Sequence, residues 1–130
     1  MSKRKGSNAE RELVRMFWAT GEWAASRVAG SGSSRFPSPD LLAGNGKRKL
    51  AIECKSTMDE KKYIAKEQVE ALRLFAKRFG AEAWIGLRCD ATQWFFISLD
   101  ELEEKEKEFM VSVEIGKNKG LTFNELIGRI

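Results

Sequence analysis

The clearest pattern in the chain is a stretch of alternating apolar and polar positions near residue 50. Leu50, Ile52 and Cys54 occupy every second position, and the positions between them include Glu53 and Lys55. A period of two predicts a β-strand. We expect the three apolar side chains to face the core, with Glu53 and Lys55 together on the opposite face.

A second predicted strand lies just before this one and begins next to a carboxylate. Asp40 is followed by the apolar residues 41–43 and then by Gly-Asn-Gly-Lys at 44–47. This turn chemistry favours an antiparallel hairpin. The hairpin folds Asp40 back toward Glu53 and Lys55.

Periodicity and turn residues predict the remaining elements. An amphipathic helix runs from residue 7 to near Gly21, and a second, over 65–79, ends at Gly80. Further predicted elements are strands at 22–29, 83–89, 92–97 and 109–115, loops at 30–38 and 56–64, turns at 90–91 and 116–120, a charged helix at 100–107, and a short terminal helix with a capping box of Thr122 and Glu125. This order predicts α/β architecture with a central mixed β-sheet.

Three consecutive apolar residues, Trp94, Phe95 and Phe96, require both faces of their strand to be covered by helices, by a partner subunit or by both. Core packing explains them better than stacking on bases, because no Arg or Lys is interleaved. This strand and the exposed edges of the 65–79 helix are candidate dimer interfaces.

The size of the chain limits its organisation. With 130 residues, 42% of them hydrophobic, residues 1–130 suit one domain, and residues 1–6 form a basic arm expected to be flexible. No apolar run approaches the roughly 18 residues of a membrane span, so we expect a cytoplasmic protein. Cys54 and Cys89 lack metal-ligand spacing and are predicted to be reduced, buried thiols.

Asp40, Glu53 and Lys55 form the string P-D-x12-E-x-K, which suits a metal-dependent nuclease site. The chain has no histidine, and oxygen ligands favour a hard cation such as Mg²⁺, for which Mn²⁺ is expected to substitute. A cation between the two carboxylates can polarise a phosphate while Lys55 supports the developing charge. Glu-x-Lys also occurs as a simple charged pair on exposed strands, but the hairpin context favours phosphodiester hydrolysis.

Glu10 is the candidate fourth member of this site. In one interpretation it completes a Ser7-x-x-Glu10 capping box at the start of the first helix. In the other it completes the metal shell beside the basic residues Arg11 and Arg15. The two roles are compatible, and the sequence does not separate them.

Charge is distributed unevenly along the chain. The net charge is +4, but residues 100–108 carry six acids and two lysines, a local charge of −4 that leaves +8 on the remainder. A polyanion is therefore the expected partner. The basic positions near the predicted site are Lys3, Arg4, Lys5, Arg11, Arg15, Arg27, Arg35, Lys47, Arg48, Lys49, Lys61, Lys62 and Lys66. Among them, Arg27 and Arg35 flank the small-residue loop 30–38, whose backbone can approach phosphates closely.

Four blocks of sequence together resemble the archaeal Hjc-type Holliday junction resolvases, which are restriction-endonuclease-like PD-(D/E)xK nucleases. The blocks are residues 5–13 (Lys-Gly-Ser-Asn-Ala-Glu-Arg-Glu-Leu), 27–31 (Arg-Val-Ala-Gly-Ser), 39–46 (Pro-Asp-Leu-Leu-Ala-Gly-Asn-Gly) and 52–55 (Ile-Glu-Cys-Lys). The likeness is dense up to about residue 56, looser to residue 80 and weak after residue 89. Residues 33–38 depart from the pattern of the family, because they form a longer stretch than in close relatives.

The resemblance implies a restriction-endonuclease-like fold and a homodimeric, Mg²⁺-dependent endonuclease that makes paired symmetric nicks in four-way junction DNA. By this likeness Glu10, Asp40 and Glu53 match metal-binding or catalytic carboxylates, and Lys55 matches the catalytic lysine. Arg11 and Arg27 match functional arginines of the family and Ser31 matches its loop serine, and all three are expected to bind DNA. Independently, two symmetric cuts by a chain with one site require a two-fold pair of subunits.

Two alternatives stay open at this stage. The same fold and metal chemistry serve duplex, mismatch or flap nucleases, because the reaction does not identify the shape of the DNA. A non-catalytic DNA-binding module is the other, although the full set of Glu10, Asp40, Glu53 and Lys55 would then be a coincidence.

Overall fold

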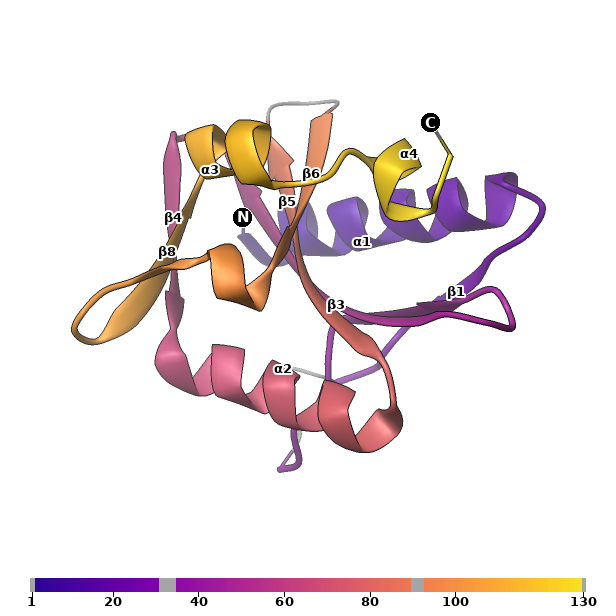
Figure 1. Ribbon diagram of the computed structural model, residues 1–130, viewed down its shortest axis with the longest axis horizontal. Helices are drawn as coiled ribbons and strands as arrows, with labels where there is room; N and C mark the ends of the chain where they lie inside the picture. Colours follow the sequence, from indigo (N-terminus) through magenta and orange to yellow (C-terminus); the bar gives the residue numbers. More distant parts are fainter. Residues whose placement is uncertain (1, 31–34, 90–92, 130) are drawn as a thin grey trace.

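The computed structural model describes residues 2–30, 35–89 and 93–129, with side chains from residue 8 onward. Its elements are shown in Figure 1. In chain order they are α1 (Ser2–Ala19), β1 (Ala24–Arg27), β2 (Leu41–Gly44), β3 (Lys49–Thr57), β4 (Lys61–Ala65), α2 (Lys66–Phe79), β5 (Glu82–Cys89), β6 (Gln93–Ser98), the 3-10 helix η2 (Leu99–Glu101), β7 (Glu103–Glu104), β8 (Glu108–Ser112), α3 (Val113–Lys119) and α4 (Phe123–Leu126).

The central sheet has five strands in the order β1-β2-β3-β5-β6. β3 pairs in parallel with β5, and the other neighbours pair antiparallel. A smaller sheet has the order β4-β8-β7. The predicted α/β class with a central mixed sheet flanked by helices is confirmed.

Helix α1 covers one face of the central sheet (Figure 1). Its buried residues Leu13 and Phe17 pack with Leu50 and Ile52 of β3 and with Phe96 of β6. These side chains have essentially no solvent exposure. The apolar parity predicted for β3 is therefore the face on which α1 lies.

Helix α2 covers the opposite face. Val69, Leu72 and Ala76 of this helix share a buried cluster with Ala51 of β3 and Ile85 of β5. Ala51 has the same parity as Glu53 and Lys55, so the face that carries these polar groups begins inside the core. On this face of β3, the polar side chains of the candidate site begin only at Glu53, in the middle of the strand.

Strand β6 is covered on both faces, as its sequence requires. Trp94 and Phe96 pack in the α1 cluster, whereas Phe95 packs in the α2 cluster and touches Gly116 of α3. All three aromatic side chains are at most 5% exposed within one chain, so the core of this chain accounts for their apolar character. A role of this strand in a dimer interface stays a prediction.

The N-terminus differs from its prediction. Helix α1 begins at Ser2, so residues 2–6 are helical instead of an arm, and Ser7 lies inside the helix. Lys and Arg are good helix formers and extend the helix through Gly6. The predicted capping box of Ser7 with Glu10 therefore has no helix start to cap.

Three further segments also differ. The loop predicted for 56–64 contains the end of β3 and most of β4, because β4 pairs with the distant β8 and buries Ile64. The charged helix predicted for 100–107 is η2 followed by β7, which also pairs with β8. The turn predicted at 116–120 lies largely in α3, whose start is capped by Ser112. Long-range strand pairing overrode local propensity in the first two cases.

Several local predictions are confirmed. Helix α2 ends at Gly80, which has a left-handed φ of 80°, and Thr122 and Glu125 form the capping box of α4. Cys54 and Cys89 form no disulfide among the described residues, and Cys89 is buried as predicted, whereas Cys54 is only partly buried. No helix among the described residues is long and apolar enough to cross a membrane. The predicted turn at 90–91 lies outside the described residues.

Replacing Phe17 by alanine should lower the free energy of unfolding by about 3–5 kcal/mol, because this ring is fully buried between α1 and the sheet. Urea denaturation followed by far-UV circular dichroism measures the change. Met58→Ala, at a residue that is 71% exposed, is the control and should change stability by less than about 0.5 kcal/mol. Equal effects of the two substitutions would contradict the packing described for α1.

Candidate active site

The β2–β3 hairpin positions Asp40 beside the far end of β3. Leu41 pairs with Ile52, so Asp40 lies opposite Glu53. The backbone N–H of Cys54 donates a 2.9 Å hydrogen bond to Asp40 Oδ2. The backbone carbonyl of Asp40 accepts from Val28, so β1 also holds this residue.

Glu53 and Lys55 project from the same face of β3, as their parity predicts. Lys55 Nζ lies 3.7 Å from Glu53 Oε2, and the side chains are 18% and 15% exposed, respectively. Lys55 Nζ also lies 3.4 Å from Oε1 of Gln68, on α2. The ammonium is thus held between a carboxylate and an amide at the edge of the core.

The surroundings of Glu53 disfavour its negative charge. Burial raises the pKa of Glu53 to about 7, and the nearby charge of Asp40 acts in the same direction. Lys55 opposes this rise, whereas a hydrogen bond with Asp40 and the charge of Glu10 add to it. Two carboxylates at the end of one hairpin therefore lack enough positive charge to be ionised together without cost.

Glu10 joins this cluster from α1. Its Oε1 accepts a 3.0 Å bond from Arg27 Nε at the end of β1. Burial raises the pKa of Glu10, the ion pair with Arg27 opposes the rise, and the charge of Asp40 adds to it. Glu10, Asp40 and Glu53 therefore lie within electrostatic range of one another, although α1, β2 and β3 are separate in sequence.

The donor set at this end of the sheet suits a hard divalent cation. Asp40 and Glu53 supply oxygen ligands, and an added cation would relieve the repulsion between them. In the described part of the chain, however, no three acidic or cysteine side chains already form a metal cage. Glu10 is the third carboxylate, and its Oε1 is bonded to Arg27. Asp40 and Glu53 are thus the residues best placed to hold a metal, and Glu10 could add a third ligand if its bond to Arg27 were released.

Cys54 lies between Glu53 and Lys55 in the sequence, but its side chain faces the other side of the strand. It is partly buried against the α1 cluster, and burial raises the pKa of its thiol well above the ordinary value. A protonated thiol is neither a good nucleophile nor a metal ligand. The contribution of Cys54 to the site is its backbone N–H, which fixes Asp40.

The predicted DNA-binding residues fall into three groups. Arg27 is bonded to Glu10, and Arg11 and Arg35 are exposed. The segment of Lys3, Arg4 and Lys5 belongs to α1, but their side chains, like Ser31, lie outside the described residues.

Arg48 belongs to the basic set counted from the sequence but has a structural role. It forms a two-pronged ion pair with Glu82 at 2.8 Å and donates to the carbonyl of Leu126. It directly precedes β3, whereas Glu53 lies in the middle of that strand. Arg48 therefore fastens α4 to the sheet and does not contribute to the basic surface near the site.

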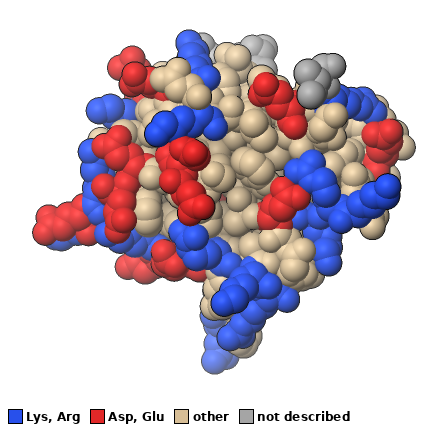
Figure 2. Space-filling model, in the orientation of Figure 1, with Lys and Arg blue, Asp and Glu red and all other residues tan. Residues whose placement is uncertain are grey.

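Charged side chains are segregated on the surface. Figure 2 shows acidic groups gathered on the side that carries β7 and β8, and basic groups at the lower end, over α2. Several acids of the 100–108 stretch are paired within the chain, including Glu104 with Lys66 at 3.0 Å and Glu101 with Lys119 at 3.7 Å. These pairs compensate the lysines as well as the acids, so the net charge of the chain stays +4.

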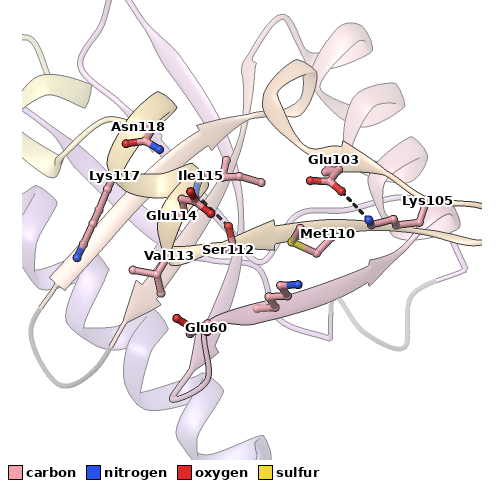
Figure 3. Close-up of a pocket in the computed structure, with 11 residues that line it drawn as sticks. Glu60, Glu103, Lys105, Met110, Ser112, Val113, Glu114, Ile115, Lys117 and Asn118 are labelled. Carbon is pink, nitrogen blue, oxygen red and sulfur yellow. Dashed lines mark hydrogen bonds and ion pairs between the residues drawn. The ribbon is translucent and has the colours of Figure 1, made fainter.

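A cavity of about 480 Å³ lies elsewhere, between the small sheet and α3 (Figure 3). Its lining mixes acids such as Glu60 and Glu103 with bases such as Lys105 and Lys117. Lys105 is paired with Glu103. None of the predicted catalytic residues lines this cavity, and its balanced charge does not favour a polyanion.

Gln68 is the site residue that the sequence did not reveal. It lies in an ordinary amphipathic helix, and no local pattern marks it. Only the packing of α2 over the end of β3 brings its side chain to Lys55. The one available signal in the sequence was its position as a polar residue in the first turn of that helix.

Comparison with known proteins gives consistent matches over the whole chain. The family model for archaeal Holliday junction resolvase (Hjc) matches residues 1–130. The crossover junction endodeoxyribonuclease Hjc of Archaeoglobus fulgidus is 41% identical over 133 residues, covering 97% of each chain. The protein of the same name from Methanocaldococcus jannaschii is 35% identical, over 97% of this chain and 89% of its own.

A solved structure is also similar. The structure of Archaeoglobus fulgidus Hjc, described as a Holliday junction resolvase from an archaeal hyperthermophile, superposes with a TM-score of 0.87 at 38% identity. The match covers 97% of this chain and 98% of that chain. The overall fold therefore has a close counterpart over nearly the whole chain.

Neutralising Glu53 should stabilise the protein at alkaline pH when divalent cations are absent. Because the folded-state pKa, about 7, exceeds the unfolded value of 4.5, stability falls as pH rises from 4.5 through 7. Glu53→Gln removes this loss, so it should be more stable than the wild type by about 2–3 kcal/mol at pH 8 and by much less at pH 5. Urea denaturation in EDTA at both pH values measures the difference.

The control is Glu106→Gln, at an exposed position of the β7–β8 connection. Its effect on stability should not differ appreciably between the two pH values. A Glu53→Gln effect that is equally independent of pH would show that the charge of Glu53 carries no cost in the folded protein.

Proposed function

Because the chain belongs to the archaeal Holliday junction resolvase (Hjc) family, we propose that it resolves four-way DNA junctions by Mg²⁺-dependent phosphodiester hydrolysis, making paired nicks as a homodimer. Similar proteins are named crossover junction endodeoxyribonucleases. Endonuclease activity on junctions is the part of the proposal that these names support. The metal, the dimer and the symmetric nicks go further: the metal rests on the geometry of the site, and the dimer with its paired nicks rests on an apolar groove and on the symmetry of the substrate.

One observation carries the proposal, which is the convergence of Asp40, Glu53 and Lys55 at the end of the β2–β3 hairpin. Two carboxylates held opposite each other by strand register offer oxygen ligands at a fixed spacing. The ammonium 3.7 Å from Glu53 adds positive charge on the same face. If these residues served only the stability of the fold, two neighbouring carboxylates would be unfavourable, because their mutual repulsion lowers stability.

Each of these residues has a distinct task. Asp40 is oriented by the Cys54 N–H, and Glu53 lies directly across the hairpin. Lys55, steadied by Gln68, is placed to stabilise the negative charge that develops on the phosphate. When bound, Mg²⁺ would supply Lewis-acid polarisation of the phosphate and lower the pKa of water. Mn²⁺ prefers similar ligands and should substitute.

The DNA contacts are assigned to the basic residues near the site. Arg11 and Arg35 are exposed, and Arg27 lies at the end of β1 next to Asp40 in the paired sheet. Lys3, Arg4 and Lys5 complete the set by their charge, and Ser31 completes it by family likeness. Contacts of this kind position the phosphate backbone and make binding depend on salt.

An apolar groove supports the homodimer. The groove has a volume of about 370 Å³ and lies between the β1–β2 end of the sheet and the end of α2. Its walls include Trp18, 58% exposed, and Phe79, 47% exposed and stacked on Phe75 at 5.1 Å. The residues that line it are Trp18, Ala24, Ala25, Ser26, Leu42, Ala43, Gly44, Lys49 and Phe79.

A second copy of the chain is the occupant that best fits this groove. A four-way junction has two-fold related strands to cut, and each chain provides one site, so a two-fold pair matches the substrate. Large, partly exposed aromatic side chains that line one apolar groove are typical of protein interfaces. Phe79, the last residue of α2, lines the groove, so the proposed interface includes the end of the predicted 65–79 helix.

The wild type should nick an immobile four-way junction in Mg²⁺ at paired sites and leave a linear duplex of the same arm sequence intact. Asp40→Asn should reduce the single-turnover rate at least about 100-fold, because it weakens a ligand that acts in the transition state. Labelled strands resolved on denaturing gels measure the rate. Junction binding in Ca²⁺, measured by fluorescence anisotropy, should persist in the variant.

Equal cutting of junction and duplex would replace this proposal with a general duplex nuclease of the same fold. Binding without cleavage in either Mg²⁺ or Mn²⁺ would instead indicate a non-catalytic DNA-binding module. Asp100→Asn, in the acidic region away from the hairpin, is the matched control and should cleave at the wild-type rate.

Phe79→Asp should convert the dimer to a monomer, because it introduces a charge into the apolar groove. Analytical ultracentrifugation over a range of concentrations measures the state. Met58→Asp places the same charge at another highly exposed apolar residue and should leave the dimer intact. A dimer that survives Phe79→Asp unchanged would remove the groove from the interface.

A further inference from the structure

The ion pair between Glu10 and Arg27 links a carboxylate of the candidate site to a predicted DNA-binding residue. Arg27 Nε lies 3.0 Å from Glu10 Oε1, and the side chains are 37% and 18% exposed. The pair joins α1 to the end of β1, at the edge of the three-carboxylate cluster. Glu10 is therefore already neutralised by a residue of the chain itself.

The other two carboxylates of the site, Glu53 and Asp40, have different kinds of partner. Lys55 lies near Glu53, at 3.7 Å, which is longer than the Arg27 contact. Asp40 receives the neutral N–H of Cys54. A divalent cation placed by Asp40 and Glu53 would compete with Arg27 for the Glu10 carboxylate, whose Oε1 is already bonded to Arg27.

A released Arg27 would have a second partner available in the complex with DNA. A guanidinium binds carboxylate and phosphate with the same planar donor geometry. Arg27 follows Ser26 in the strand that pairs with β2, so it lies beside the hairpin that presents Asp40. The scissile phosphate must reach that same hairpin to be hydrolysed.

From this geometry we propose that Arg27 couples metal binding to DNA binding: it neutralises Glu10 in the free protein and transfers to a DNA phosphate in the complex, which releases Glu10 to the metal. The proposal rests on the metal-dependent function proposed above. Its consequence is reciprocal, because DNA must strengthen metal binding by the same factor by which metal strengthens DNA binding. The free enzyme would then hold the cation weakly and complete its site on the substrate.

The first measurement is Ca²⁺ affinity of the DNA-free protein by isothermal titration calorimetry at constant ionic strength. Arg27→Gln should bind Ca²⁺ more tightly than the wild type by about fivefold, because no ion pair has to be broken. Arg11→Gln is the matched control. Arg11 also acts on the charge of Glu10 but donates its hydrogen bond to Asn8 instead, so its removal should have a smaller effect.

The second measurement is junction affinity by fluorescence anisotropy, in Ca²⁺ and in EDTA. In the wild type Ca²⁺ should strengthen junction binding, and in Arg27→Gln this gain should shrink by about the same fivefold factor. Arg11→Gln should weaken junction binding in both buffers and keep the gain. Arg27→Gln should also lose cleavage activity, although it binds the cation more tightly.

Three outcomes would overturn the proposal. One is an Arg27→Gln protein whose DNA-free Ca²⁺ affinity is unchanged or lower. Another is a rise no larger than that of Arg11→Gln, which would show a general charge effect. A coupling between Ca²⁺ and junction that survives in Arg27→Gln is the third. By contrast, wild-type protein that binds no Ca²⁺, Mg²⁺ or Mn²⁺ with or without junction would overturn the metal-dependent function itself.

Discussion

The pairing register of β2 with β3 is the constraint on which the site depends. Leu41 lies opposite Ile52, which places Asp40 across from Glu53 and within reach of the Cys54 N–H. Because side chains alternate between the two faces of a strand, a slip of one residue would turn Glu53 and Lys55 toward α1 and bring Ile52 to the polar face. The burial of Leu50 and Ile52 under α1 makes that slip costly, so the core itself enforces the geometry of the carboxylates.

The two helices divide the work around this hairpin. Helix α1 buries one face of β3 and presents Glu10 at the edge of the cluster, while α2 buries the other face and brings Gln68 to Lys55. The site is therefore assembled from four elements that meet only in the folded chain. Its negative charge is a cost that the fold tolerates, seen most clearly in the raised pKa of Glu53. A binding partner that supplies positive charge would recover this cost, which is why cation binding and folding stability are expected to be linked.

Ion pairs away from the candidate site have a structural role. Arg48 and Glu82 satisfy each other and fix α4 against the sheet. Glu12 of α1 likewise accepts bonds from Arg88 of β5 and from Trp94 of β6, at 2.6 and 2.8 Å. These pairs lock the helix to the sheet. Arg27 differs because its partner is a carboxylate of the candidate site, so its ion pair can be exchanged for another without releasing the core.

The sequence by itself determined the hairpin, the shared face of Glu53 and Lys55, helix α2 with its stop at Gly80, and the two strands that follow. These features depend on neighbours within a few residues, where periodicity and turn chemistry act directly. It did not determine the strand β4 or the pairing of β7 with β8. Both depend on hydrogen bonds to distant strands, which outweigh the polar composition of those segments. The partner of Glu10 was likewise decided by tertiary structure: the local pattern offered a capping box, but the helix begins earlier, and the sheet brings Arg27, 17 residues away, to the carboxylate.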